Sequence, residues 1–195
     1  MKPERIVVVG ALALAACQTS TSPPGAKSVA LVETDVAQVA DAIATGMEAE
    51  REGSVDGLVD AVLALERFGA RFGDDTPDLS RRWRDLARAR GADLPPPFRG
   101  RALGPAYSRG AIDPRGVFVT EQVFLAGQPA EVAVVPQAER QLRIVVTDQD
   151  NKILCERVAA APRAMCRWLP LFTRRVTIRV QNPRAYAVNY YLVTN

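Results

Sequence analysis

The sequence predicts an α+β fold, in which a small helical bundle precedes an antiparallel β-sandwich. Apolar residues recur every three or four positions over residues 28–92, which is typical of helices packed through one face. From residue 118 on they recur every second position, which is typical of strands. The 195 residues are enough for one or two small domains, each with a hydrophobic core.

Residues 1–17 have the organisation of an export signal. Lys2 and Arg5 form a basic start, and an apolar run too short to span a bilayer follows. The run ends in Leu14-Ala15-Ala16-Cys17, which resembles the lipobox of bacterial lipoproteins. The resemblance implies that residues 1–16 are removed as a signal peptide and that Cys17 is lipidated, palmitate being a typical acyl group. The alternatives are an ordinary signal peptide cleaved elsewhere and an uncleaved anchor.

The expected location follows from the residue after the lipidated cysteine. Gln18 stands where lipoproteins retained at the inner membrane often have Asp, so we expect a lipid anchor in the outer membrane, facing the periplasm. More than one acyl chain anchors a protein stably, so the membrane is the first expected partner. Residues 17–27 are polar and rich in turn formers, which predicts a flexible tether.

Three helices are predicted in the helical domain, residues 28–92. The first runs from Ser28 to about Glu52, and the second begins after Ser54 as its N-cap. The third begins with Thr76 as N-cap and Pro77 as the first helical residue. We expect the apolar stripe of the first helix to pack within the bundle. Packing of this stripe on a partner or a second copy is the alternative.

The third helix carries a cluster of arginines around Trp83, namely Arg81, Arg82, Arg84 and Arg88. Behind an export signal, such a patch could bind lipid phosphates, lipopolysaccharide or peptidoglycan carboxylates. The simpler interpretation is a solvated basic face, with Trp83 in the core. The formal net charge of the chain, +3, is too small to indicate nucleic-acid binding, and we expect no nucleic-acid partner.

Residues 93–117 are expected to form an ordered connector. Pro95, Pro96 and Pro97 exclude a helix, and turn residues then alternate with single apolar side chains. A purely flexible linker would not carry Leu103 and Tyr107, so we expect this segment to pack onto one of the domains.

The sandwich domain, residues 118–195, is predicted to contain seven short strands separated by turn signals. They cover residues 119–125, 130–135, 141–147, 152–158, 164–169, 174–181 and 188–194.

Short segments of this half resemble the bacterial pre-peptidase C-terminal domain: Phe124–Gln128, Val145–Lys152, Trp168–Pro170, Thr177–Asn182 and Asn189–Leu192. The resemblance implies a jelly-roll-like sandwich on an exported protein, usually as an accessory or binding module. Members with a calcium role often carry an Asp-x-Asp motif near the middle strand, and the matching stretch, residues 141–144, lacks these acids. Asp148 and Asp150 could bind calcium, but a hairpin turn explains them more simply. We therefore expect no metal and no cofactor.

Two cysteines remain if Cys17 is lipidated. A hairpin centred on Ala160 and Ala161 would place Cys155 opposite Cys166, within reach of a disulfide. Because the periplasm is oxidising, we expect a structural bridge rather than two free thiols.

The sequence predicts a non-catalytic binding or scaffold module for a protein, glycan or peptidoglycan partner. There is no histidine, no Gly-x-Ser-x-Gly elbow and no Ser-x-x-Lys motif, so the common sets of catalytic residues are missing. One alternative is an enzyme or accessory domain that acts on envelope polysaccharide through paired carboxylates. Another is a self-assembling structural subunit that uses the first helix.

Overall fold

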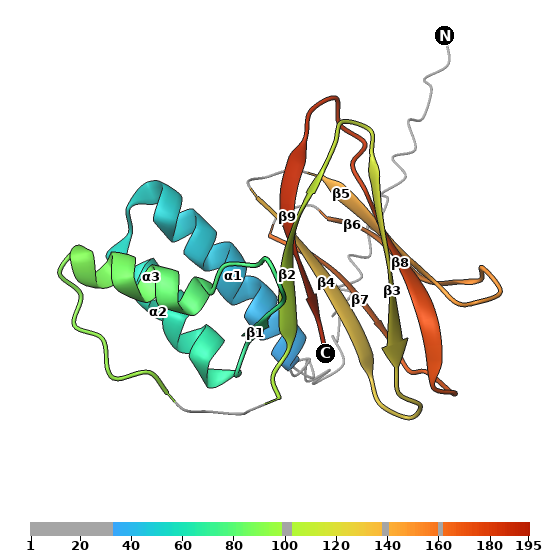
Figure 1. Ribbon diagram of the computed structural model, residues 1–195, viewed down its shortest axis with the longest axis horizontal. Helices are drawn as coiled ribbons and strands as arrows, with labels where there is room; N and C mark the ends of the chain where they lie inside the picture. The colour runs from blue at the N-terminus through green and yellow to red at the C-terminus, as the bar shows by residue number, and fades with distance from the viewer. Residues whose placement is uncertain (1–32, 99–102, 138–140, 160–161) are drawn as a thin grey trace, which may run out of the picture. The chain divides into compact units, whose positions relative to one another are not determined.

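Helices and two β-sheets form three layers in the computed structural model, which describes residues 33–98, 103–137, 141–159 and 162–195 (Figure 1). Residues 33–195 cluster as one compact unit. The predicted α+β fold is confirmed, with three helices followed by antiparallel-rich sheets. None of the helices in the described ranges is long and apolar enough to cross a membrane.

The first two helices begin at polar caps. Helix α1 covers Asp35–Glu52, and the side chain of Thr34 accepts a hydrogen bond from the backbone N–H of Ala37. The predicted start at Ser28 is therefore too early, since Thr34 is extended and caps the helix; residues before 33 lie outside the described residues. Helix α2 covers Val55–Arg67 and has the predicted N-cap, Ser54. Gly53 between the helices has a φ of 80°, a left-handed conformation that favours glycine.

The predicted start of the third helix is wrong by a few residues. Helix α3 covers Leu79–Ala89, and its N-cap is Asp78, whose side chain accepts from the backbone N–H of Arg81. The hydroxyl of Thr76 instead accepts from the backbone N–H of Arg109 at 3.1 Å, so it is used by a tertiary contact. Local cap preference could not distinguish two good capping residues this close together.

The nine strands in the described ranges form two sheets. Sheet A has the order β1-β2-β9-β4-β7, and sheet B has the order β3-β8-β5-β6. Apart from the parallel pair β1 and β2, neighbouring strands are antiparallel. The strands are β1 Arg71–Phe72, β2 Ala106–Ile112, β3 Val117–Phe124, β4 Ala130–Pro136, β5 Leu142–Thr147, β6 Ile153–Ala159, β7 Ala164–Trp168, β8 Arg174–Gln181 and β9 Val188–Thr194.

The segment expected to be a connector contains a strand. Strand β2 pairs with β9 along its whole length, from Ala106 opposite Thr194 to Ile112 opposite Val188. Gly110 has the signature of a turn in the sequence, but it lies within the strand. A Cβ atom at this position would come within 2.5 Å of the Tyr190 ring, so glycine is needed for close packing rather than for a turn.

Two hydrophobic cores hold the three layers together. One lies between the helices and sheet A, and the other lies between the two sheets. Strand β4 is buried along its whole length because both of its faces are covered. Val36, Val39 and Ile43 of α1 are at most 1% exposed and belong to the first core. The apolar stripe of the first helix is therefore used within the molecule, as predicted.

Candidate functional site

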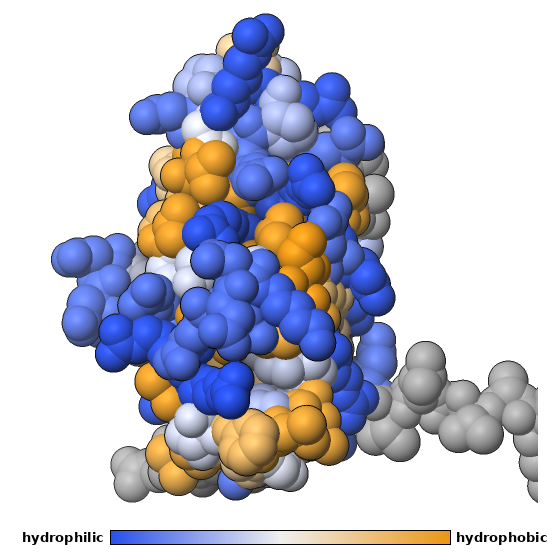
Figure 2. Space-filling model, turned by 90° about the vertical axis from the view of Figure 1, so that its right-hand side faces the viewer, coloured by the Kyte–Doolittle hydropathy of each residue, from blue (hydrophilic) through white to orange (hydrophobic). Residues whose placement is uncertain are grey.

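The helices cover sheet A, and no helix contributes to the core beneath sheet B. The outward side chains of sheet B therefore form a surface, called the open face below (Figure 2). Their neighbours along each strand point into the inter-sheet core, as strand alternation requires. The outward-facing residues of sheet B are Val117, Val119, Glu121, Val123, Arg143, Val145, Thr147, Glu156, Val158, Arg175, Thr177, Arg179 and Gln181. Val145 and Thr147, on the inner strand β5, are covered by their neighbours and only 8% and 5% exposed.

Cations and apolar side chains alternate across the open face, and Figure 2 shows the resulting mixture of hydrophilic and hydrophobic surface. Arg179 lies in register between Val119 of β3 and Val145 of β5. Its guanidinium donates to the hydroxyl of Thr147 at 3.2 Å. Within the described residues it has no carboxylate partner, so its charge is available to a ligand.

Two further arginines of the open face form ion pairs along its surface. Arg175 contacts Glu121 at 3.1 Å, and Arg143 contacts Glu156 at 2.6 Å. All four side chains are more than a third exposed, so each pair contributes little to stability. These charges can therefore exchange partners on binding at a low cost in folding free energy.

Strand β3 is an open edge of sheet B. Val117, Val119 and Val123 are each more than half exposed on it. The backbone N–H of Asn182 donates to the carbonyl of Gly116, next to β3, so by alternation the backbone groups of residues 117, 119, 121 and 123 point away from β8. Strand β3 contains no proline, glycine or lysine. Its one charged side chain is Glu121, so it has few of the devices that prevent another strand from pairing with an edge.

The other three edges are protected. Strand β1 has only two residues, and β7 has five and carries a disulfide. Strand β6 has a register irregularity against β5, and Arg157 occupies an inward-facing position in its alternation. Short strands, bulges and inward charges all hinder edge pairing. Among the edges that the structure describes, β3 is therefore the one best suited to accept a partner strand.

A groove of about 1030 Å³ lies between the second half of α1 and the strand ends near Pro136 and Asn189. Its acidic side chains are Asp41, Glu48, Glu50 and Glu52. Asp41 accepts two hydrogen bonds from Arg163, at 2.6 and 2.8 Å. Glu48 is paired with Arg51. These carboxylates are used by structural ion pairs.

Glu50 in the same groove is held ionised. Partial burial raises its pKa, but hydrogen bonds from Arg82 and from the Trp83 indole, together with nearby positive charge, lower the pKa by more. The indole nitrogen lies 3.0 Å from the carboxylate. A general acid needs a raised pKa, so the environment of Glu50 opposes that role.

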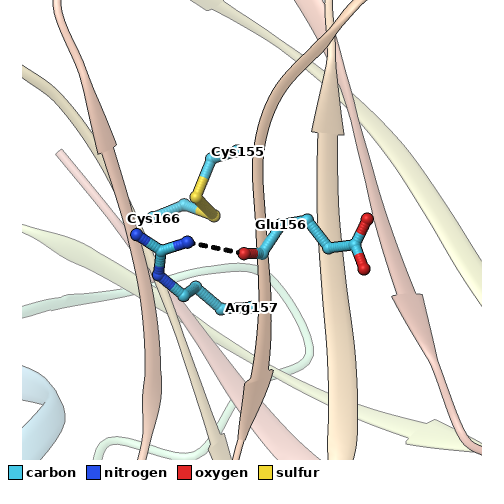
Figure 3. Close-up of a disulfide and its surroundings, with 4 residues drawn as sticks. All are labelled: Cys155, Glu156, Arg157 and Cys166. Carbon is cyan, nitrogen blue, oxygen red and sulfur yellow. Dashed lines mark hydrogen bonds between the residues drawn. A yellow bond between two sulfur atoms is a disulfide. The ribbon is translucent and has the colours of Figure 1, made fainter.

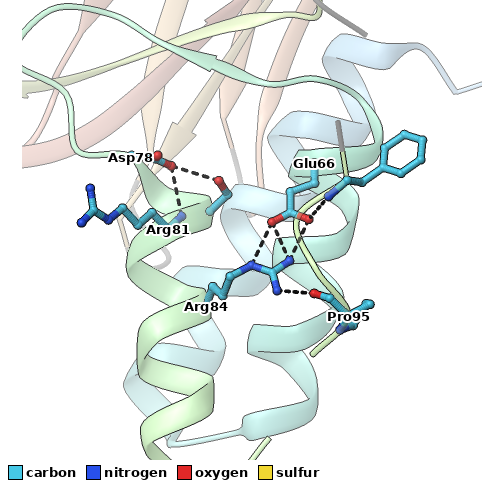
Figure 4. Close-up of polar contacts among 7 residues, drawn as sticks. Glu66, Asp78, Arg81, Arg84 and Pro95 are labelled. Atoms are coloured by element: carbon cyan, nitrogen blue, oxygen red, sulfur yellow. Dashed lines mark hydrogen bonds and ion pairs between the residues drawn. The ribbon is translucent and has the colours of Figure 1, made fainter. Parts of the chain in front are cut away.

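The arginines of the third helix do not form one anion-binding patch. Arg84 is 4% exposed, and its guanidinium binds both carboxylate oxygens of Glu66 and donates to the carbonyl of Pro95 (Figure 4). Glu66 also accepts from the backbone N–H of Phe98 at 3.1 Å. This corrects the expectation for Arg84. Because it lies two residues after Arg82, its side chain is on a different face of the helix, the face that packs on α2.

The other members of the cluster lie apart from Arg84. Arg82 is paired with Glu50 across the contact between α3 and α1. Arg81 and Arg88 are exposed. Trp83 is fully buried and belongs to the core, as the simpler interpretation predicted. Gly46 of α1 lies against its ring, since a Cβ atom there would come within 2.3 Å of it.

The predicted disulfide between Cys155 and Cys166 is confirmed, but its predicted setting is wrong (Figure 3). Strand β6 pairs with β5 in sheet B, and β7 pairs with β4 in sheet A. The bridge therefore joins the two sheets instead of two strands of a hairpin. Sequence spacing alone could not show that the chain changes sheets between the two cysteines.

The remaining predicted sites are the hairpin with Asp148 and Asp150 and the lipobox at Cys17. The side chain of Asp148 accepts from the backbone N–H groups of Asp150 and Lys152, at 3.0 and 2.9 Å, which is the expected turn role. No cluster of His, Cys, Asp and Glu within the described ranges could hold a metal ion. Cys17, the signal peptide and the tether lie outside the described residues.

No family model and no curated protein matches the chain. Among solved structures, the pre-peptidase C-terminal domain of a collagenase from Bacillus anthracis is similar at 12% identity and a TM-score of 0.39, covering 46% of this chain and 87% of that one. PliG from Aeromonas hydrophila, a periplasmic inhibitor of g-type lysozyme, is similar at 15% identity and a TM-score of 0.36, covering 47% and 84%. The carbohydrate-binding module TmCBM61, in complex with β-1,4-galactotriose, is similar at 14% identity and a TM-score of 0.31, covering 45% and 68%. The predicted resemblance is thus found at low identity over less than half of the chain.

Proposed function

We propose that this chain is an exported lipoprotein, anchored through Cys17 in the outer membrane and facing the periplasm, whose sandwich binds a protein partner on the open face. The observation that carries the binding role is the open face itself. Among the described residues, it offers exposed valines, an arginine without a carboxylate partner and an unpaired strand edge on one continuous sheet. Each of these features provides a different kind of contact to a partner.

The disulfide supports export. Cys155 and Cys166 join the two sheets inside the core, at 9% and 0% exposure. Structural disulfides persist in oxidising compartments such as the periplasm. This agrees with the export signal and lipobox of residues 1–17, which supply the anchor in the proposal.

The chemistry of the open face favours a protein over a glycan. Sugar-binding surfaces usually present aromatic side chains, because apolar ring faces stack on sugar rings. The open face as the structure describes it carries no aromatic side chain. Its edge strand β3 instead offers backbone donors and acceptors, which pair with an extended peptide segment.

Catalysis is disfavoured by the state of the carboxylates. In the groove beside α1, Asp41, Glu48 and Glu50 are engaged with arginines. Self-assembly through the first helix is disfavoured as well, because its apolar stripe is buried against the other helices and sheet A. A binding module therefore accounts for more of the described surface than either alternative.

Mass spectrometry tests the anchor directly. The mature protein is purified from membranes, and its N-terminal peptide is expected to begin at Cys17 and to carry the mass of a diacylglyceryl group and an acyl chain. A Cys17→Ser protein should lack this modification. An unmodified Cys17 in the wild-type peptide would contradict the proposed anchor.

Site-specific crosslinking tests the open face. A photoreactive amino acid at Val119 should give one discrete adduct with an envelope protein, and the charge reversal Arg179→Glu should abolish that adduct. Asp60, exposed on α2, is the control position, where no such adduct is expected. Failure to form an adduct at Val119, or formation of the same adduct at Asp60, would contradict binding at the open face.

A further inference from the structure

Two neighbouring loops at one end of the sandwich present large apolar side chains to solvent. The β3–β4 loop carries Leu125, and the β7–β8 loop carries Leu169, Leu171 and Phe172. Their exposed fractions are 54%, 58%, 80% and 62%. These four side chains are called the apolar tip below. Clustered exposed side chains of this size indicate an interaction site, whereas single ones need no explanation.

The loops of the apolar tip are tied to each other. The backbone N–H of Gly127 donates to the carbonyl of Pro170 at 2.9 Å, and that of Ala126 donates to the hydroxyl of Thr173 at 3.0 Å. Next to them Phe124 and Trp168 pack edge to face, with ring centroids 5.0 Å apart. These contacts hold the two loops of the apolar tip side by side.

Arginines surround the apolar tip. Arg167 and Arg175 are ion-paired with Glu131 and Glu121, whereas Arg174 has no carboxylate partner among the described residues. The guanidinium of Arg174 lies over the Phe172 ring, 5.0 Å from its centroid. Apolar and aromatic side chains beside cations are typical of protein surfaces that enter the interface of an anionic bilayer.

The chain enters the described unit near the apolar tip. Thr34 and Asp35, at the start of α1, line a shared groove with Pro129 and Arg167, which lie at the bases of the two loops. Figure 1 shows the start of α1 and both loops toward the same end of the sheets. The described part of the chain therefore begins at the end that carries the apolar tip.

We propose that the apolar tip inserts into the surface of a lipid bilayer that contains anionic headgroups. The choice of a membrane over a protein rests on Arg174 beside Phe172 and on the proposed anchor, which brings that end close to lipid. Insertion of the tip would fix the orientation of the sandwich. The open face would then stand to the side of the contact, accessible to a partner in the periplasm.

A fluorophore on the tip tests the insertion. Cys155 and Cys166 are bridged and Cys17 is acylated in the proposal, so a cysteine introduced by Leu171→Cys is the single reactive thiol. The mature protein is labelled there and reconstituted in vesicles of phosphatidylcholine and phosphatidylglycerol that carry a spin-labelled lipid. We expect strong quenching of the fluorophore. The matched control is Leu63→Cys on α2, a partly exposed leucine outside the tip, where no quenching is expected.

Further measurements distinguish a failure of the proposed insertion from a failure of the proposed anchor. Phe172→Ser in the Leu171→Cys protein should reduce quenching, whereas Phe98→Ser, an exposed phenylalanine after α3, should leave it unchanged. If mass spectrometry shows that Cys17 carries no lipid, the anchor fails. Quenching is then measured with Leu171→Cys in a Cys17→Ser background, which keeps a single reactive thiol, after the protein is mixed with the same vesicles. Equal quenching at positions 171 and 63 would overturn the inference. Protection of position 171 from iodide only when envelope proteins are added would identify a protein interface and would also overturn it.

Discussion

Arg84→Met is expected to destabilise the protein strongly, because it leaves the carboxylate of Glu66 buried and poorly paired. The side chains of the pair are 5% and 9% exposed. After the substitution Glu66 keeps the backbone N–H of Phe98 as a donor, and the carbonyl of Pro95 loses its guanidinium donor. Breaking a buried ion pair from one side costs about 3–5 kcal/mol. In urea, with an m-value near 2 kcal/mol/M, the midpoint should fall by roughly 2 M.

The matched control lies two residues earlier on the same helix. Arg82 pairs with Glu50, and their side chains are 55% and 31% exposed. Arg82→Met should therefore cost only about 0–1 kcal/mol. The double variant Arg84→Met/Glu66→Leu should recover most of the stability lost in Arg84→Met, because no unpaired charge stays buried. Equal urea midpoints for Arg82→Met and Arg84→Met would refute the assignment of Arg84 to a buried structural pair.

Three further changes test the packing. Gly46→Ala places a Cβ atom against the Trp83 ring, and such overpacking should lower the unfolding free energy by about 1–3 kcal/mol in urea. Replacing Cys155 and Cys166 by Ala removes a bridge with a sequence separation of 11, and a closed loop of that length predicts that the unfolding free energy falls by about 3 kcal/mol. Dithiothreitol should destabilise the wild type but not this variant. Burial raises the pKa of Tyr107, so its neutral hydroxyl stabilises the fold below pH ~10, and this contribution is lost as the pH rises further. Tyr107→Phe lacks this ionisable group, so the difference in unfolding free energy between wild type and variant should shrink by about 1.4 kcal/mol per pH unit above pH ~10. Urea unfolding of both proteins between pH 8 and about 11 measures this difference.

Each of these three predictions has a result that would contradict it. The control for Gly46 is Gly73→Ala, where a Cβ atom would meet its nearest neighbours at 3.7 Å; an equal loss in both variants would argue against a tight contact with Trp83. A bridge-free variant as stable as the oxidised wild type would show that the disulfide contributes nothing to the fold. Parallel pH curves for the wild type and Tyr107→Phe would show that Tyr107 ionises as easily in the folded state as in the unfolded one.

The sequence by itself determined most of the secondary-structure elements of this protein, whereas its location at the outer membrane stays a prediction. Periodicity located three helices and seven of the nine strands, because side chains of half-buried elements repeat with the geometry of the backbone. The two cysteines left after Cys17 and the expected oxidising compartment predicted the disulfide, although the hairpin assumed for it was wrong. The lipobox at Cys17 stays a prediction, since it depends on recognition of a linear segment rather than on the fold.

The tertiary structure decided which of these elements pack against one another and which of their side chains are buried. Strand β2 was missed because Gly110 resembles a turn residue, although its missing side chain makes room for Tyr190. The disulfide joins two sheets because the chain crosses between them, and pairing arithmetic along one chain assumes a hairpin. Which arginine of a cluster is buried depends on an acid at a distant position, as for Arg84 and Glu66.

The candidate site depended on the tertiary structure most of all. Sequence alternation shows that each strand has two faces, but it does not show which face another layer covers. The helices lie on sheet A, so sheet B keeps an open face and β3 keeps an open edge. Likewise, Leu125 and Phe172 belong to separate loops in the sequence, and only the folded chain brings them to the same end. Local residue patterns specify the elements, whereas binding surfaces arise from contacts between residues distant in the chain.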